Sequence, residues 1–194
     1  METIQLNDYV EAVYPELSTL MNVKVFETMK GFFKVTEDDV KLDRNTPPDQ
    51  FVYGAQVVEL MYSAPDLKAV IKIHYSPSET YDILGMVRHD PKLPKIENLN
   101  KVFAEFGNQL AGNLKAGFTD MGYIGGISLP VPASAYDEMI SSDILVKGRL
   151  YSYCGIEIKG TIKIVLTITI QNEGQGLKDY VYSEKVVQEE DEFL

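Results

Sequence analysis

A glutamate and an asparagine three residues apart, Glu105 and Asn108, have the types and spacing in this sequence that best suit chemistry. Side chains three positions apart in an α-helix are neighbours on one face. The carboxylate offers a negative charge, and the carboxamide both donates and accepts hydrogen bonds. Together they offer an approaching group one charged contact and two kinds of hydrogen bond.

Most exposed helix stripes of this kind are only solvated, and two features of the helix around this pair weaken that interpretation. In the plainer interpretation Lys101 and Glu105 form an i,i+4 ion pair, contributing only ~0.3 kcal/mol in this orientation. Asn108 is poorly suited to a helix interior because its amide competes for the backbone. Gly112, on the same face, costs about 1 kcal/mol relative to alanine. Residues of low helix propensity at exposed positions beside a carboxylate suggest that another group approaches the helix closely there.

A periodicity of 100° per residue predicts one long helix over residues 97–121 with two distinct faces. Gly107 and Gly117 lie toward the buried side, where close helix–sheet packing explains them. The face opposite the core continues through Lys115 and Thr119. The residues expected to point into the core are Leu99, Val102, Phe103, Phe106, Leu110, Leu114 and Phe118.

The remaining patterns predict an α+β domain made of two similar α/β halves. We expect a single domain over 1–194, with a first half over about 1–90, a second over about 95–172 and an acidic tail over 173–194. The predicted elements are a helix over 7–21, strands over 23–26 and 32–35, an acidic loop over 36–50, a hairpin of 51–62 and 67–75, a helix over 76–89, a linker over 90–94, and strands over 127–131, 144–153 and 156–170.

Charge and cysteine content exclude several classes of protein. The 194 residues carry 18 basic and 29 acidic side chains, a net charge of −11, which disfavours nucleic acid or anionic lipid as a partner. Cys154 is the single cysteine, so an intrachain disulfide is impossible. The sequence shows no signal peptide and no apolar stretch of membrane-spanning length. We therefore expect a soluble, cytoplasmic protein.

Other candidate sites have simpler explanations. His74 and His89 are 15 positions apart with no neighbouring cysteine, so no zinc site is expected. Cys154, expected at a hairpin-like turn, is interpreted as a small packed residue. The sequence contains no Gly-x-Ser-x-Gly elbow, phosphate-binding glycine loop or dinucleotide fingerprint.

At the long helix the sequence resembles the chemotaxis phosphatase family of CheC, CheX and FliY. The family pattern is Ser or Asp, three residues, Glu, two residues, Asn, then about twenty-two residues and a proline. Glu105, Asn108 and Gly112 match its Glu-x-x-Asn-x-x-x-Gly core, while Lys101 replaces the Ser or Asp. Pro130 lies one position closer than the pattern, and Pro132 lies one position further away.

The resemblance covers most of the chain and is closest to CheX. Residues 8–13 and 20–25 look like the opening of CheX-type members. CheC carries the motif in both halves, whereas CheX has one copy. Here residues 11–14 read Glu-Ala-Val-Tyr, with Tyr14 where Asn would be needed. The resemblance therefore implies a CheC-like fold, two pseudo-repeated α/β halves sharing an antiparallel sheet with helices on one face, and a single site.

The family implies a hydrolase acting on the aspartyl phosphate of a CheY-like response regulator. Asn108 would hold a water in line with the phosphorus, and Glu105 would pair with the regulator's active-site lysine. Lys101, Gly112 and Pro130 would contact the partner. The required Mg²⁺ would be held by the regulator, so this chain is expected to bind no metal or cofactor itself. CheX-type members are typically homodimers, and the strand ending at Ile170 offers a sheet edge for pairing.

Two alternatives stay open from the sequence. The chain is either a phosphatase or a non-catalytic CheX-like module that binds a receiver domain, or only itself, without hydrolysis. Lys101 supports the second, since a cation beside Glu105 competes for its charge. A third interpretation is an unrelated globular dimer whose helix stripe is only solvated.

Overall fold

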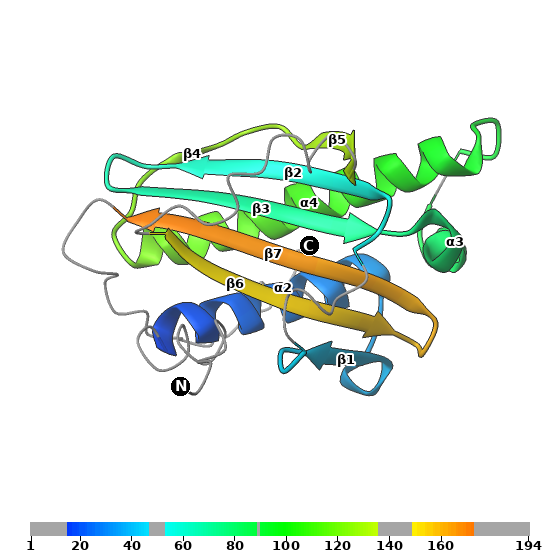
Figure 1. Cartoon of the computed structure of the whole chain (residues 1–194), viewed down its shortest axis with the longest axis horizontal. Helices are drawn as coiled ribbons and strands as arrows, with labels where there is room; N and C mark the ends of the chain where they lie inside the picture. Colours follow the sequence, from blue (N-terminus) through cyan, green and yellow to red (C-terminus); the bar gives the residue numbers. More distant parts are fainter. Residues whose placement is uncertain (1–14, 47–52, 89, 136–148, 173–194) are drawn as a thin grey trace, which may run out of the picture.

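The computed structural model describes residues 15–46, 53–88, 90–135 and 149–172, and its strands form one antiparallel sheet (Figure 1). Two short 3₁₀ segments, Glu37–Asp39 and Tyr81–Gly85, lie between the main elements. The helices and strands, in chain order, are α2 (Pro15–Phe33), β1 (Val40–Asp43), β2 (Gln56–Ser63), β3 (Leu67–Tyr75), α3 (Pro77–Thr80), α4 (Lys95–Asp120), β4 (Gly126–Ile127), β5 (Val131–Ser134), β6 (Arg149–Ile158) and β7 (Ile162–Asn172).

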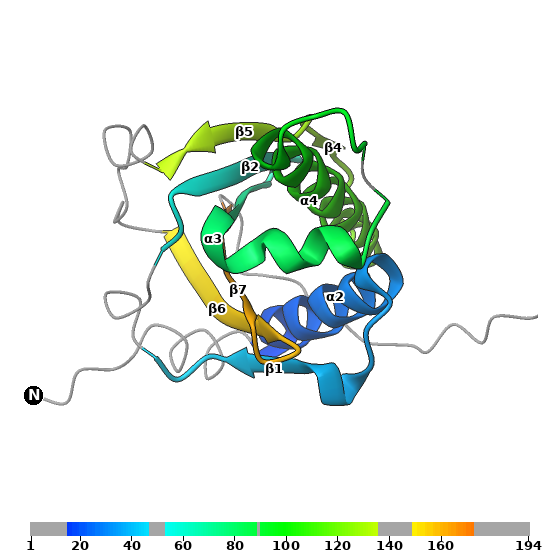
Figure 2. The same ribbon diagram turned by 90° about the vertical axis from the view of Figure 1, so that its right-hand side faces the viewer.

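The order of the strands confirms the predicted pair of similar halves. The hairpins β2–β3 and β6–β7 meet in the middle of the sheet, where β3 pairs with β7. Each half lends a short strand to the other, because β1 pairs with β6 and β5 pairs with β2. Helices α2 and α4 lie side by side on one face, and the sheet curves partly around them (Figure 2). The fold is α+β with an antiparallel sheet, as expected.

The core lies between this sheet and the two long helices, and aromatic pairs fix α4 against it. Tyr75 of β3 stacks on Phe103 with ring centroids 3.9 Å apart, and Tyr62 of β2 stacks on Phe118 at 5.0 Å. The Tyr75 hydroxyl also donates a 2.6 Å hydrogen bond to Oδ1 of Asn100. Since these contacts hold both ends of α4, its outer face has a defined orientation.

Helix α2 covers the strand predicted over 23–26 and the first two residues of the strand predicted over 32–35, so both predicted strands were wrong. The buried residues Met21, Val25, Met29 and Phe33 recur every four positions, which is a helical stripe. Their β-branched and aromatic character favoured strands over short windows, but burial against α4 and the sheet decides the state. The predicted helix over 7–21 continues to residue 33, and its residues before 15 lie outside the described ranges.

The second half of the sheet differs from prediction in where its strands turn. Strand β6 continues through Cys154 and Gly155, so the break expected there, with Cys154 at a turn, is wrong. The chain reverses instead at Lys159 and Gly160, whose φ angles are 51° and 72°. Strand β1 was also missed within the predicted loop over 36–50, because four mostly exposed residues give little periodicity.

Other boundaries are confirmed or shortened. The β2–β3 hairpin is confirmed, with Ala64 and Leu67 exchanging backbone hydrogen bonds across its turn. The helix predicted over 76–89 starts as expected at Pro77 but becomes a 3₁₀ segment that ends at Gly85. The free sheet edge predicted at the strand ending at Ile170 is wrong. Strand β7 is internal and paired on both sides, so it offers no edge for dimerisation.

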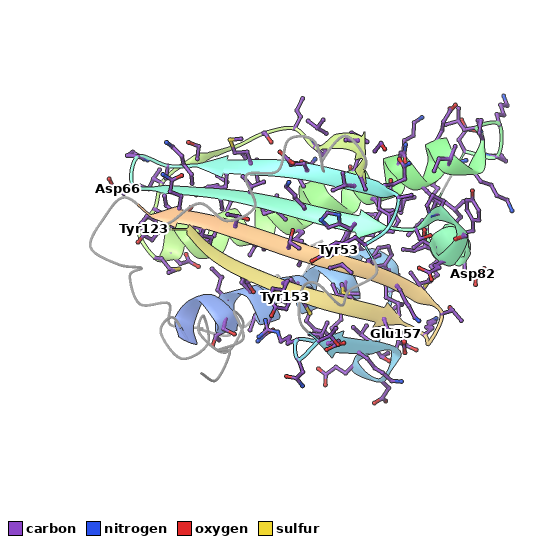
Figure 3. All side chains as sticks on the ribbon, viewed as in Figure 1. Tyr53, Asp66, Asp82, Tyr123, Tyr153 and Glu157 are labelled. Carbon is purple, nitrogen blue, oxygen red and sulfur yellow. The ribbon has the colours of Figure 1, made fainter. Side chains whose placement is uncertain are left out.

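The two ends of the sheet carry different features. Asp82, in the 3₁₀ segment after α3, lies at the end where α4 begins, whereas Asp66 and Tyr123 lie at the other (Figure 3). The backbone carbonyl of Tyr123 accepts a 2.8 Å hydrogen bond from the buried Tyr62 hydroxyl. No helix within the described ranges has the length and apolar character needed to cross a bilayer.

Candidate functional site

Helix α4 presents the predicted site residues on one exposed stripe. Lys101, Glu105, Asn108 and Gly112 are all exposed, while the predicted core residues of the same helix are buried. The apolar face is held by the sheet and α2, so these four residues face outward together. The sequence therefore predicted both faces of α4 correctly.

The side chains of Glu105 and Asn108 have few partners in their own chain. Glu105 Oε1 accepts one long hydrogen bond, 3.5 Å, from Nε2 of Gln109. Among the residues that the structure describes, neither Asn108 nor Lys101 has a side-chain hydrogen bond or ion pair. The Lys101–Glu105 ion pair of the plainer interpretation is thus not formed there. Both the carboxylate and the carboxamide are available to an incoming group.

Gly112 has no packing role within the described structure. A Cβ built on Gly112 would meet nothing within 4 Å, whereas one on Gly107 would lie 2.9 Å from Leu60 Cδ1. Gly107 therefore allows close helix–sheet packing, as predicted. Gly117 differs from the prediction, because its close neighbour is Leu20 of α2 and the packing is between helices. Gly112 is the glycine on α4 that its own fold leaves unexplained.

The proline of the motif lies outside α4. Pro130 is half-buried in the segment between β4 and β5, which runs along β2 at the edge of the sheet. Helix α4 contacts both β4 and β5. The structure therefore places Pro130 on elements adjoining α4, while the other four predicted site residues share one helix face.

A surface groove of about 840 Å³ adjoins the exposed stripe of α4. This groove was not predicted from the sequence. Its walls come from the end of α2, the segment after α3 and the first half of α4. Lys101 and Glu105 belong to it, so the groove and the stripe form one continuous surface. Its lining residues are Phe32, Lys34, Met86, Val87, Arg88, Asp90, Pro91, Asn98, Lys101, Val102 and Glu105.

One buried amide fixes the wall of this groove. Asn98 is 4% exposed, and its Oδ1 accepts a 3.0 Å hydrogen bond from the backbone N–H of Asp90. Its Nδ2 donates to the carbonyls of Asp90 at 2.8 Å and Leu93 at 3.2 Å. Asparagine is unfavourable inside a helix, so the presence of Asn98 in α4 was the one sign in the sequence that this position has a special role.

The other candidates are structural where they are described. His74 is buried on β3 and contacts the Tyr53 ring edge-on at 4.9 Å, and His89 lies outside the described residues. Cys154 is buried within β6, and this burial raises the pKa of its thiol to about 11. No cluster of ligating side chains that would hold a metal ion occurs within the described ranges.

The sequence matches no protein-family model and no curated protein sequence. The fold, however, matches solved structures over about four fifths of the chain. A CheX in a CheX–CheY–BeF₃–Mg²⁺ complex from Borrelia burgdorferi shares 16% identity at a TM-score of 0.61, covering 80% of this chain and 97% of the other.

Two further structures agree with this match. A CheC-like superfamily protein from Shewanella sp. PV-4 shares 14% identity at a TM-score of 0.60, covering 81% of this chain and 98% of that one. FliY from Thermotoga maritima shares 15% identity at a TM-score of 0.52, covering 87% and 91%. The chain therefore has the fold of the CheX, CheC-like and FliY chemotaxis proteins.

Proposed function

We propose that this protein is a phosphatase that hydrolyses the aspartyl phosphate of a CheY-like response regulator. The observation that carries the proposal is the pair Glu105 and Asn108, exposed and nearly without partners on α4, beside a glycine that the fold does not require. The likeness of the fold to a CheX bound to CheY supports a receiver domain as the partner.

The chemistry needs positioning and charge stabilisation, both of which this stripe offers. Asn108 carries a carboxamide that holds a water by donating and accepting hydrogen bonds, in line with the phosphorus of the substrate. Glu105 pairs with a lysine of the receiver and fixes the register of the helix. Lys101, Gly112 and Pro130 contact the partner. Mg²⁺ is held by the receiver as part of the substrate and neutralises charge on the phosphoryl group.

The decisive experiment follows the decay of a phosphorylated CheY-type receiver with and without this protein. The wild type should accelerate decay, and Asn108→Ala and Glu105→Ala should each return it to the spontaneous rate. Lys163→Ala is the matched control, because Lys163 is an exposed residue on β7, outside α4. Acceleration that survives loss of Asn108 would contradict the proposed site.

The rival function is a receiver-binding module without hydrolysis. It predicts that the phosphorylated receiver binds while its decay rate stays unchanged, so the same assay with a pull-down separates the two. The observation that favours it is Lys101, whose exposed cation stands one turn from Glu105 where the family has Ser or Asp.

We infer that the assembly is a homodimer, with a different surface from the one first expected. Since β7 is internal, the edges of the described sheet are β1 at one end and β4 with β5 at the other, and we place the contact at β4 and β5. Leu129 and Val131 are 81% and 58% exposed along it, which supports an apolar contact. Light scattering should give twice the mass of the chain, and a monomer at high concentration would overturn the inference.

A further inference from the structure

The groove beside the α4 stripe carries an unusual balance of charge for this chain. Three cations, Lys34, Arg88 and Lys101, line it with two acids, Asp90 and Glu105. The whole sequence has the opposite balance, 18 basic against 29 acidic residues. An excess of cations in a groove of an acidic protein attracts anionic groups to that place.

These three cations are not used by the rest of the described structure. All three are exposed, and none has a side-chain hydrogen bond or ion pair among the described residues. The acid Asp90 differs, since its Oδ1 accepts a 2.9 Å hydrogen bond from the backbone N–H of Lys92. The positive charge of the groove is therefore available to a partner.

The groove is preformed, so occupying it requires little ordering of this chain. The hydrogen bonds from Asn98 hold the backbone at Asp90 and Leu93 against α4. On the opposite wall, Phe32 packs against Phe106 at 5.7 Å between ring centroids. A preorganised site avoids part of the entropic cost of binding.

We propose that this groove receives a carboxylate-bearing segment from the phosphorylated face of the receiver, an inference that rests on the function proposed above. Lys101 and Asn108 are seven residues apart, about 10 Å along a helix. A protein interface of standard size covers a patch of about 16 Å radius on each partner. A receiver whose phosphoryl group lies at Asn108 therefore reaches the Lys101 end of the groove as well.

This placement gives Lys101 a role that differs from competition with Glu105. Together with Lys34 and Arg88 it attracts the carboxylate-bearing segment, which raises the association rate and makes it sensitive to salt. The departure from Ser or Asp at this position then sets which receivers bind. The reaction itself stays with Glu105 and Asn108.

The test measures association of a receiver activated with beryllofluoride and Mg²⁺, by stopped flow at several salt concentrations. The double variant Lys34→Ala, Arg88→Ala should slow association about tenfold at low salt and flatten its salt dependence. Arg88→Glu, which changes the charge of the groove by the same two units, should slow it by a similar factor. Decay of phosphorylated receiver at saturation should match that of the wild type, because neither residue touches the reacting atoms.

Lys163→Ala is the control for loss of one exposed positive charge, and circular dichroism confirms that each variant is folded. If the groove variants associate with the receiver as fast as this control, the proposed role of the groove is refuted, while the proposed phosphatase activity still stands. Weakened binding by the groove variants with no hydrolysis by the wild type would support the groove and overturn the phosphatase. A wild type that does not bind the receiver would overturn both.

Discussion

Gly112 is the residue at which stability and the proposed binding of the receiver make opposite demands. It lies inside α4 with open space where a Cβ would stand, so Gly112→Ala removes the entropic cost of glycine without a clash. The free energy of unfolding should rise by about 1 kcal/mol, measured by urea denaturation. In the proposed function the methyl group obstructs the receiver, so acceleration of phosphate decay should fall at least severalfold.

Gly31 supplies the matched control for this change. It is also an exposed helix glycine with nothing within 4 Å of a built Cβ, but it lies on α2. Gly31→Ala should give a similar gain in stability and leave phosphate decay unchanged. If Gly112→Ala stabilises the protein and retains full activity, close approach of the partner at Gly112 is refuted.

Cys154 should make the stability depend on pH in the alkaline range. Burial raises the pKa of its thiol from 9.0 to about 11, so the native state favours the protonated form. The stabilisation is complete below the pKa of the unfolded chain and is lost as pH rises through about 11. Between pH 8 and 11 the wild type should lose about 2 kcal/mol more than Cys154→Ala.

Urea denaturation of both proteins at several pH values measures this difference and cancels the titration of lysines and tyrosines common to both. Parallel curves would show that the thiol ionises as freely in the native state as in the unfolded chain. The buried thiol should also react with Ellman's reagent only after unfolding.

At the residue scale, the sequence predicted what lies on a single helix and missed what several segments assemble. The faces of α4 follow from a periodicity that all its residues share. The groove joins Lys34, Arg88 and Lys101 from three segments, and no local pattern relates their positions. Only the fold brings them together.

At the scale of elements, local propensity failed where tertiary packing opposed it. The segment around Val25 has strand-forming residues, yet it is helical because one stripe of it packs in the core. Where propensity and packing agreed, as in β2 and β3, the prediction held. The end of β6 was missed because the turn depends on a lysine, Lys159, in a left-handed conformation that its type does not signal.

The turn between β6 and β7 stores strain that one substitution should release. Ile158 O accepts a 3.2 Å hydrogen bond from the Thr161 N–H around Lys159 and Gly160, both with positive φ, which is a type I′ turn. Asparagine tolerates this conformation better than lysine, so Lys159→Asn should raise the free energy of unfolding by about 0.5 kcal/mol. Gly160→Ala should lower it by about 1 kcal/mol.

Lys159→Gln is the control for Lys159→Asn, since it removes the same charge without asparagine's preference for the left-handed region. Thermal and urea denaturation of the three proteins compare them directly. A glutamine variant as stable as the asparagine variant would refute the backbone explanation, because loss of the lysine charge alone removes an attraction to Asp39 and should not stabilise the protein.

At the scale of the whole molecule, the exchange of short strands makes the two halves depend on each other. Strand β1 of the first half completes the edge beside β6, and β5 of the second half pairs with β2. The sequence suggested two halves from the order of its elements. It could not show the exchange, because strands of four residues carry almost no pattern and their partners lie more than 70 positions away.

This exchange predicts that neither half folds alone, as expected of the single domain proposed from the sequence. A fragment of residues 1–90 leaves β3 without β7, and a fragment of 95–194 leaves β7 without β3, which exposes the central strands of the sheet. Each fragment alone should show no cooperative thermal transition by circular dichroism. An equimolar mixture should regain one, because the β3–β7 pairing and the core around α4 form only between the halves. Cooperative unfolding of either fragment by itself would show two independent domains. The groove beside α4 is lined by residues from both halves, so it would then lie at an interface between two docked domains and not on a shared core.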